Sequence, residues 1–262
     1  MQNRYQPKWL IITLFLLLIL ARQAFVQAQK SDDYNRSYVP LVTTNLPSCE
    51  IPGQTYHALN VTGSSSNPDA EDNPDLNLGL RGYELTTASL ELVEIGPLVD
   101  SKAPQFPALF SNNRVPVFSN AYHRYRWDWD CHCPTDTYSP WDTTLLGMAV
   151  APGEIIQVPD SGYDIGGGYE VMVLYADEER ITFHVGNSDK LDGYVMHLED
   201  VCTEPDLLAL YESLHANGRR RLPVLRGHQP FGRALGNEIK IAVRDSGHFL
   251  DPRSRNNWWQ GR

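Results

Sequence analysis

The sequence lacks the features that would bind nucleic acid or hold the chain firmly in a membrane. Lysine and arginine number 22 against 32 aspartates and glutamates, so the formal net charge is −10. A chain this acidic does not neutralise phosphates, which excludes nucleic acid as a partner. The longest uncharged apolar run, Trp9–Leu20, has 12 residues, fewer than the roughly 20 that span a bilayer. We therefore expect membrane contact only through this N-terminal segment.

The patterns of several enzyme classes are also missing. The chain has no G-x-S-x-G, no H-E-x-x-H, no phosphate-binding glycine loop and no internal repeat. The tripeptide DSG occurs at Asp160–Gly162 and Asp245–Gly247, but Tyr163 and His248 follow where aspartic peptidases have a hydroxyl residue. We interpret both tripeptides as turns between strands.

What the N-terminus does contain is the pattern of a secretory signal. Arg4 and Lys8 precede the apolar run, and the small residues Val26 and Ala28 come before an expected cleavage point at about Gln29. We expect residues 1–28 to be a signal peptide, with an uncleaved anchor as the alternative, and the protein to act at the cell envelope or outside the cell. Cleavage would remove three positive charges and no negative ones, which changes the net charge from −10 to −13.

Cysteine is scarce but informative. The four cysteines are Cys49, Cys131, Cys133 and Cys202. In an exported chain they predict two disulfides, for which three pairings exist. Because Cys131 and Cys133 are so close in sequence, we expect each of them to pair with Cys49 or Cys202, which would join the two halves of the chain.

Composition divides the chain into a tether and a β-rich remainder. Residues 29–80 contain the polar, acidic and proline-broken Ser64–Asp75, and we expect them to form an extended acidic tether with a short strand at Tyr38–Val42. Residues 81–145 are expected to be a β-rich N-terminal region and 146–262 a second β-domain. The strand-like runs are Ala88–Ile95, Tyr169–Ala176, Arg180–Val185, Gly193–Leu198 and Glu238–Arg244. Their spacing predicts a mainly β fold, a sandwich or a barrel-like domain.

One helix is expected, over residues 203–217. Thr203 is placed to cap it and Gly218 to end it. Its apolar stripe, which we assign to packing, is made of Leu207, Leu210, Tyr211 and Leu214.

The segment WDWDCHC, Trp127–Cys133, is the densest group of chemically active side chains. Its carboxylates, histidine and thiols could bind a metal, whereas in an oxidising compartment the thiols form disulfides. On a strand, Trp127 and Trp129 share one face and Asp128 and Asp130 the other. The indoles are then either core or a stacking surface for a sugar, and these four residues are our candidate binding residues.

The stretch from Leu146 to Pro252 resembles the β-domain of the M23 (lysostaphin or LytM type) zinc peptidases, which cut peptidoglycan cross-bridges. Its glycine/proline-rich entry is matched by Ala151–Gly153, which runs on to the turn at Val158–Gly162. The family motif G-Y-x-x-H-L is matched by Gly193–Leu198, and G-x-Q-x-(I/F)-G by Gly227–Gly232. The closing strand and the final G…(V/L)-D-P are matched by Glu238–Arg244, then Gly247 and Leu250–Pro252.

The functional residues implied by this resemblance are mostly replaced. The two histidines of the closing motif fall on Glu238 and Lys240, and the H-x3-D pair falls near Leu145–Ala149, which is apolar. Only His197 matches a functional histidine, and a catalytic zinc needs three protein ligands. The resemblance therefore implies a domain that has lost its zinc, so we expect no catalytic residue, no metal and no cofactor.

Three questions stay open at this stage. His197 is either a structural histidine bonded to its neighbours, a residual acid–base group, or part of another metal site with His123, His132 or His184. The basic segment 219–262, with a net charge of +7, either attracts the acidic remainder or offers a basic face to an anionic envelope polymer. The C-terminal Trp258 and Trp259 either pack on the core or stay exposed for a partner.

These observations favour a secreted, non-catalytic binding or structural protein. The expected partners are peptidoglycan, another envelope polysaccharide or other envelope proteins. The alternative is an enzyme, either a divergent zinc peptidase or a glycan hydrolase acting on the cell wall, with a carboxylate pair that the sequence does not identify.

Overall fold

The computed structural model describes residues 48–61, 70–96, 100–186 and 193–262. The segment Leu46–Arg262 forms one compact unit. The expected signal peptide and the strand expected at Tyr38–Val42 lie outside the described residues.

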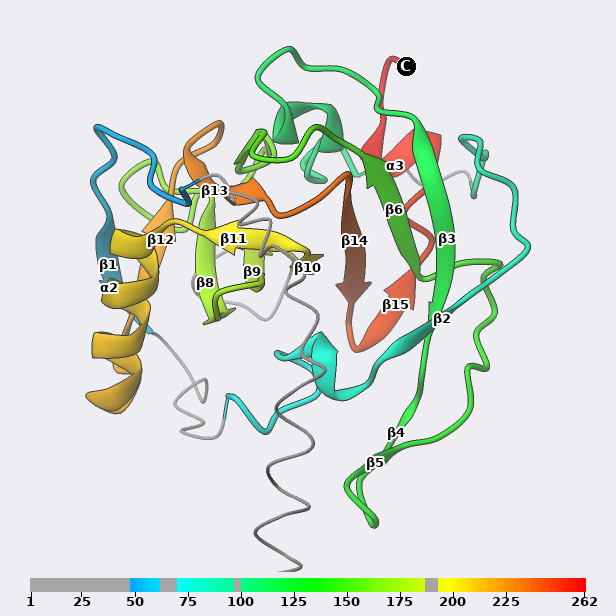
Figure 1. The fold of residues 1–262 in the computed structure, drawn as a ribbon, viewed down its shortest axis with the longest axis horizontal. Coiled ribbons are helices and arrows are strands. Elements are labelled where there is room, and N and C mark those ends of the chain that lie inside the picture. Colours follow the sequence, from blue (N-terminus) through cyan, green and yellow to red (C-terminus); the bar gives the residue numbers. More distant parts are fainter. Residues whose placement is uncertain (1–47, 62–69, 97–99, 187–192) are drawn as a thin grey trace, which may run out of the picture. The chain divides into compact units, whose positions relative to one another are not determined.

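Most of the described strands belong to one large antiparallel sheet. Its strands are β1 His57–Asn60, β2 Tyr83–Leu85, β3 Phe118–Arg124, β6 Leu145–Ala149, β8 Val171–Ala176, β9 Arg180–Gly186, β10 Gly193–Glu199, β12 Arg221–Leu225, β14 Glu238–Asp245 and β15 His248–Leu250. They follow the order β1-β12-β8-β9-β10-β14-β6-β3-β2, and β15 pairs with β14 (Figure 1). Among the described strands β1 and β2 do not pair, so the sheet is open and does not close into a barrel.

A second, smaller sheet covers the apolar face of the large one. It contains β7 Ile155–Gln157, β11 Val201–Thr203 and β13 Pro230–Ala234, in the order β11-β13-β7. Phe231 of β13 lies edge-on against Phe183 of β9, with ring centroids 4.9 Å apart, and both side chains are fully buried. The core therefore lies between two antiparallel sheets, as in a β-sandwich, which confirms the prediction of a mainly β fold.

The remaining elements are short and lie outside the two sheets. They are η2 Leu78–Leu80, η3 Phe106–Leu109, the hairpin strands β4 Trp127–Asp128 and β5 Cys133–Pro134, and the helices α2 Pro205–Ala216 and α3 Arg255–Trp258. Helix α2 is the expected helix, and its buried side chains are Leu207 and Tyr211. Its cap is Glu204, which accepts a hydrogen bond from the Leu207 amide at 3.0 Å, because Thr203 is the last residue of β11 and donates to Asp177 O.

Four of the five expected strands coincide with β8, β9, β10 and β14 to within two residues at each end. The turn expected at Asp245–Gly247 connects β14 to β15, and both Ser246 and Gly247 adopt the positive φ that such tight turns need. The prediction of a strand at Ala88–Ile95 is wrong. Only Val93 makes a bridge there, to Ser254, because no neighbouring strand is available to the rest of the segment.

The expected tether and domain boundary also need correction. Residues 57–60 form β1, which pairs with β12, and Ala70 and Leu78 are fully buried. The described parts of residues 29–80 are therefore folded onto the domain. The boundary expected between residues 145 and 146 falls inside β6, so 81–145 and 146–262 share one sheet.

Both expected disulfides are present, with a different pairing. Cys49 is bonded to Cys202 and Cys131 to Cys133. The expectation that Cys131 and Cys133 would not pair with each other is wrong, because His132 between them adopts a positive φ of 52° and turns the chain back at the tip of the β4–β5 hairpin. The Cys49–Cys202 bond still joins the beginning of the described chain to its second half.

The C-terminal tryptophans belong to the core. Trp258 and Trp259 are 1% and 0% exposed, and Phe106 of η3 lies 5.5 Å from both rings. Their indole N–H groups donate to Asp251 O and Pro252 O. The alternative of an exposed aromatic C-terminus is thereby excluded.

Candidate functional site

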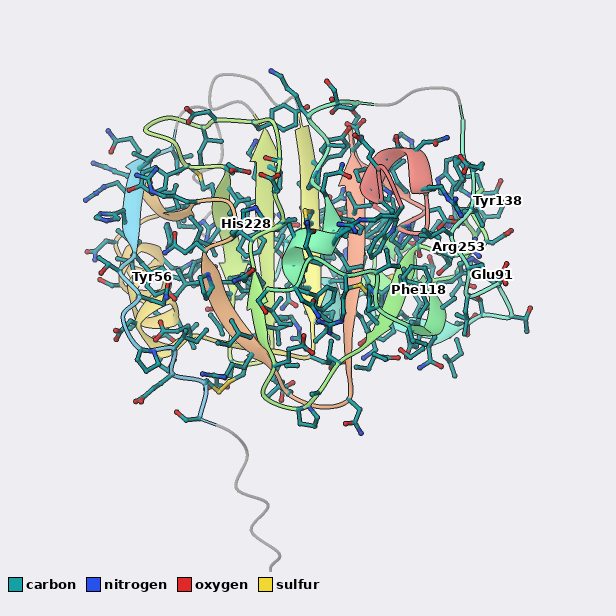
Figure 2. All side chains as sticks on the ribbon, turned by 90° about the horizontal axis from the view of Figure 1, so that it is seen from above. Tyr56, Glu91, Phe118, Tyr138, His228 and Arg253 are labelled. Atoms are coloured by element: carbon teal, nitrogen blue, oxygen red, sulfur yellow. A yellow bond between two sulfur atoms is a disulfide. The ribbon has the colours of Figure 1, made fainter. Side chains whose placement is uncertain are left out.

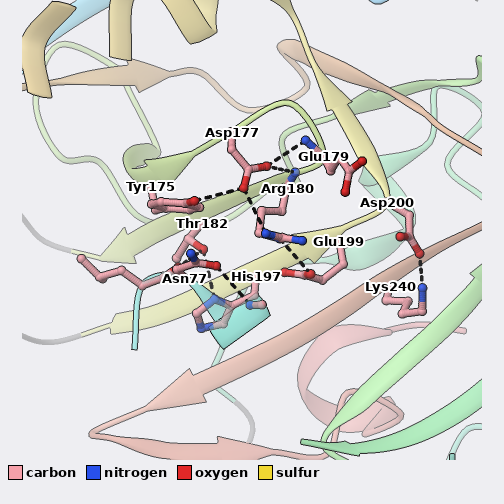
Figure 3. A network of polar contacts seen from close by, with 12 residues as sticks. Asn77, Tyr175, Asp177, Glu179, Arg180, Thr182, His197, Glu199, Asp200 and Lys240 are labelled. Carbon is pink, nitrogen blue, oxygen red and sulfur yellow. Dashed lines mark hydrogen bonds and ion pairs between the residues drawn. The ribbon is translucent and has the colours of Figure 1, made fainter. Parts of the chain in front are cut away.

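The second face of the large sheet is polar, and residues 70–82 lie over it. Cross-strand partners share a face of a sheet, and His197 on β10 is paired with Thr182 on β9 and Ala242 on β14. Thr182 donates a hydrogen bond to Leu76 O at 2.6 Å, which ties the covering segment to this face. Figure 3 shows part of this face, with Thr182, His197 and Lys240 among the labelled residues.

Lys240, near the start of β14, occupies the centre of one polar cluster. Its ammonium contacts Asp200 and lies 3.5 Å from Glu238 Oε1. The rings of Tyr83 and Tyr122 have their centroids 5.6 and 5.7 Å from it. Burial by itself would lower the pKa of Lys240, but Asp200, Tyr83 and Glu238 together raise it. Lys240 is therefore a fully charged and well-compensated cation.

Glu238 is held equally firmly. It accepts hydrogen bonds from Ser119, from Asn120 and from the hydroxyl of Tyr122, the last at 2.7 Å. Burial would raise the pKa of Glu238, but these donors and Lys240 lower it. On β6, Glu238 is paired with Ala149, but its carboxylate lies over Gly147, the partner of Lys240, where a Cβ atom would collide with it. The carboxylate thus stays ionised and fills the space that a side chain on β6 would occupy.

A second acidic group, Glu199, follows on the same face. Its side chain is 4% exposed and accepts a hydrogen bond from Arg180 Nε at 3.1 Å. Arg180 also pairs with Asp177 at 3.1 Å, and Tyr175 donates to the same carboxylate (Figure 3). Burial raises the pKa of Glu199 to about 7, although Arg180 opposes the shift.

His197 is fully buried and bonded to its neighbours. Its Nδ1 lies 3.0 Å from Thr182 Oγ1, and because the Thr182 hydroxyl proton points to Leu76 O, Nδ1 carries the imidazole proton. The ring stacks on Phe249 with centroids 5.7 Å apart. Burial and the nearby Arg244 hold the pKa of His197 well below its usual range. His197 is thus a neutral histidine without access to solvent, which agrees with a structural role.

The segments that the resemblance assigns to a zinc site lie on adjacent strands. His197 is on β10, Glu238 and Lys240 are on β14, and Leu145–Ala149 is β6 on the other side of β14. Strand β6 brings only apolar side chains and a glycine. A protonated lysine repels a metal ion and has no lone pair to donate. These residues do not fit a catalytic zinc.

The other histidines do not build a metal site in the described part of the chain. His123 is bonded to Trp141 O at 3.0 Å, His132 is exposed at the hairpin tip, and His184 lies on β9. In residues 48–61, 70–96, 100–186 and 193–262, no three His, Cys, Asp or Glu side chains are placed to hold a metal ion.

The predicted binding segment forms the β4–β5 hairpin, which projects from the body of the domain (Figure 1). Trp127 is half-buried and Trp129 is 54% exposed, with rings 6.5 Å apart at 75°. Asp128 and Asp130 are exposed beside them, and the Asp130 amide donates to Asp128 Oδ1 at 2.8 Å. The interpretation of both indoles as core is wrong for Trp129, because β4 ends before it and the hairpin leaves the sheet.

The hairpin has a second exposed aromatic ring at its base. Tyr138 is 69% exposed, at the end of the molecule opposite Tyr56 (Figure 2). The guanidinium of Arg126 lies 5.7 Å from the Tyr138 ring and is paired with both oxygens of Asp136. Trp129 and Tyr138 thus belong to one exposed aromatic hairpin.

The basic C-terminal segment is used mainly inside the fold. Lys240, Arg244, Arg253 and Arg255 contact Asp200, Asp75, Asp142 and Glu94, all from earlier in the chain. These contacts favour internal attraction over a basic face directed to solvent.

Sequence reasoning missed most partners of this polar face. Asp200 and Glu199 directly follow the Gly193–Leu198 motif, so their position after it was an available signal. Tyr83, Tyr122 and Arg180 have no local signal, because only the register of β2, β3 and β9 brings them to this face.

In comparisons with protein-family models, with curated proteins and with solved structures, no match to this chain is found. In the described part of the chain, no helix is both long and apolar enough to traverse a bilayer.

Proposed function

We propose that this is a secreted, non-catalytic binding protein of the cell envelope or extracellular space, whose peptidase-like domain has lost its zinc site. The observation that carries the proposal is the ion-paired Lys240 in the β14 position where the resemblance requires a histidine. Its charge is satisfied by Asp200 and Glu238, so the cluster closes on itself and presents no ligand set. The two disulfides are compatible with an oxidising, extracytoplasmic location.

The aromatic hairpin supplies the contact surface in this proposal. Trp129 and Tyr138 expose aromatic surface of the kind on which sugar rings stack, and the carboxylates of Asp128 and Asp130 can accept hydrogen bonds from sugar hydroxyl groups. The Cys131–Cys133 bond restrains the tip, so less conformational freedom is lost on binding. We infer an envelope polysaccharide, peptidoglycan included, as the partner.

Sedimentation with insoluble cell wall tests this function. The purified protein is expected to co-sediment equally with and without a chelator, and Trp129→Ala is expected to lower the bound fraction several-fold. Leu85→Ala, which removes a side chain 66% exposed on β2 outside the hairpin, is the matched control and should bind normally. Equal binding by both variants would contradict the role of the hairpin, and recovery of envelope proteins without polysaccharide would assign the partner to a protein.

Metal content distinguishes the enzymatic alternative. Protein purified without a metal-affinity tag is expected to hold far less than one zinc per chain after dialysis. Zinc close to one per chain, with cell-wall lysis that a chelator stops, would overturn the non-catalytic proposal.

A further inference from the structure

Three arginines surround a single buried phenylalanine at the other end of the polar face. The guanidinium carbons of Arg124, Arg244 and Arg81 lie 4.8, 5.1 and 5.8 Å from the centroid of the Phe249 ring. Arg124 ends β3, Arg244 is paired across the strands with Phe249, and Arg81 follows η2. Three separate segments of the chain therefore bring their positive charges to one place.

The carboxylates near Phe249 do not balance the charge of the three arginines. Asp75 contacts Arg81 and lies 3.2 Å from Arg244 Nη2, while Arg124 has no ion pair among the described residues. One carboxylate against three guanidiniums leaves an excess of two positive charges. The side chains of Arg81 and Arg244 are only 9% and 10% exposed, so solvent screens this excess poorly.

Several donors in the same arginine cluster have nothing to bind. Nε and Nη1 of Arg124 and Nε of Arg244 are enclosed and have no hydrogen-bond partner in the described structure. An enclosed, unsatisfied donor is costly, more so when it is charged. A water molecule could satisfy the hydrogen bonds but not the charge. Only an anion satisfies both.

The ionisation of the arginines agrees with this account. Burial, followed by repulsion from Arg81 and Arg244, lowers the pKa of Arg124 to about 10. Burial also lowers the pKa of Arg244, which Asp75 only partly offsets. Both groups remain charged at neutral pH.

We propose that Arg81, Arg124 and Arg244 form a binding site for an oxyanion, a carboxylate or phosphate group carried by a larger ligand. Guanidinium groups present paired N–H donors that match two oxygens of such a group. The carboxylate of Asp75 is 35% exposed, so the cluster borders on solvent at that side. The site is separate from Lys240, whose charge is already satisfied.

Anion titrations of the purified protein test the proposal. The probes are sodium glucuronate for the carboxylate and sodium glycerol phosphate for the phosphate, against sodium chloride at equal ionic strength. We expect one or both to raise the thermal midpoint in a saturable manner and to bind measurably by calorimetry. Whichever probe binds more tightly identifies the group that the site takes.

Arg124→Gln is the decisive variant, because it removes the arginine that has no ion pair and leaves the Asp75 pairs intact. It is expected to weaken binding at least about tenfold, the equivalent of one charge-assisted hydrogen bond. Without probe its thermal midpoint should equal or exceed that of the wild type, since it relieves repulsion. Arg126→Gln, two residues further on and exposed, is the matched control and should bind like the wild type.

Three results would overturn the proposal. The first is the absence of any stabilisation beyond that of chloride in the wild type. The second is equal stabilisation of Arg124→Gln and Arg126→Gln. The third is binding that appears only after Asp189 and Asp192 are replaced by asparagine. These residues lie between β9 and β10, outside the described part of the chain, and that result would show that the protein's own carboxylates occupy the cluster.

Discussion

Glu199 is the residue whose ionisation the fold changes most usefully for experiment. Its pKa is raised from 4.5 to about 7 by burial. Below pH 4.5 the carboxyl is protonated in both the folded and the unfolded chain. As the pH rises above 4.5, Glu199 ionises first in the unfolded chain. The free energy of unfolding therefore falls between pH 4.5 and about 7, and the full loss is present above pH 7.

We expect Glu199→Gln to remove this pH dependence. The wild type should lose on the order of 3 kcal/mol between pH 4.5 and 7.5 from this group, the equivalent of the pKa difference, whereas the variant should not. Urea midpoints across that range measure it, with the exposed Glu178→Gln as the control. Parallel curves for the wild type and Glu199→Gln would show that Glu199 has an ordinary pKa.

Lys240 permits a second test at the same scale. Lys240→Met leaves Asp200 and Glu238 facing each other without their cation, and we expect the free energy of unfolding to fall by about 2 kcal/mol. This expected loss is smaller than that for breaking a fully buried ion pair, because the side chain of Asp200 is 41% exposed. Lys102→Met, at an exposed lysine, should change it by less than about 0.5 kcal/mol. Urea denaturation at pH 7.5 measures both, and equal effects would mean that Lys240 has no special role.

At the scale of elements, sequence reasoning succeeded where a strand has buried neighbours on both sides. Strands β8, β9, β10 and β14 are central, so their side chains are β-branched, aromatic or alternating, and the pattern is visible locally. The run Ala88–Ile95 has the same alternation but only one bridge, because alternation does not create a pairing partner. The sequence could not predict the arginine cluster for a related reason. Arg81, Arg124 and Arg244 are far apart in the chain, and only the register of β2, β3 and β14 brings them together.

In the β4–β5 hairpin, we expect the disulfide to affect local order without affecting the stability of the whole domain. Its disulfide joins residues two positions apart and closes almost no loop. The double variant Cys131→Ser/Cys133→Ser should therefore change the free energy of unfolding by less than about 0.5 kcal/mol. Exchange of the Arg126 and Thr135 amides, which bond across the hairpin, should become faster. Hydrogen exchange measures this, and unchanged protection would show that the strands hold the tip without the bridge.

At the scale of the whole molecule, the Cys49–Cys202 disulfide is the contrasting case. It joins residues 153 positions apart, and the chain-entropy model assigns about 5 kcal/mol at 25 °C to a loop of that length. Cys49→Ser/Cys202→Ser should lose several kcal/mol in urea denaturation while keeping the β-sheet spectrum by circular dichroism. If this variant loses as little free energy of unfolding as the hairpin variant, the Cys49–Cys202 bond does not stabilise the fold by closing the loop.

The same bond also decides how the molecule would respond to mechanical load. A pull between a point before Cys49 and the C-terminus passes from Cys49 across the disulfide to Cys202, so the intervening residues carry no tension. That segment would measure on the order of 500 Å if fully extended, and the bond keeps this length from being released. Under tension from a surface the protein would lengthen only by what lies outside the loop, and β3, β4, β5 and β6, with the aromatic hairpin, would stay unstretched. In a reducing environment the same pull would be free to unravel them.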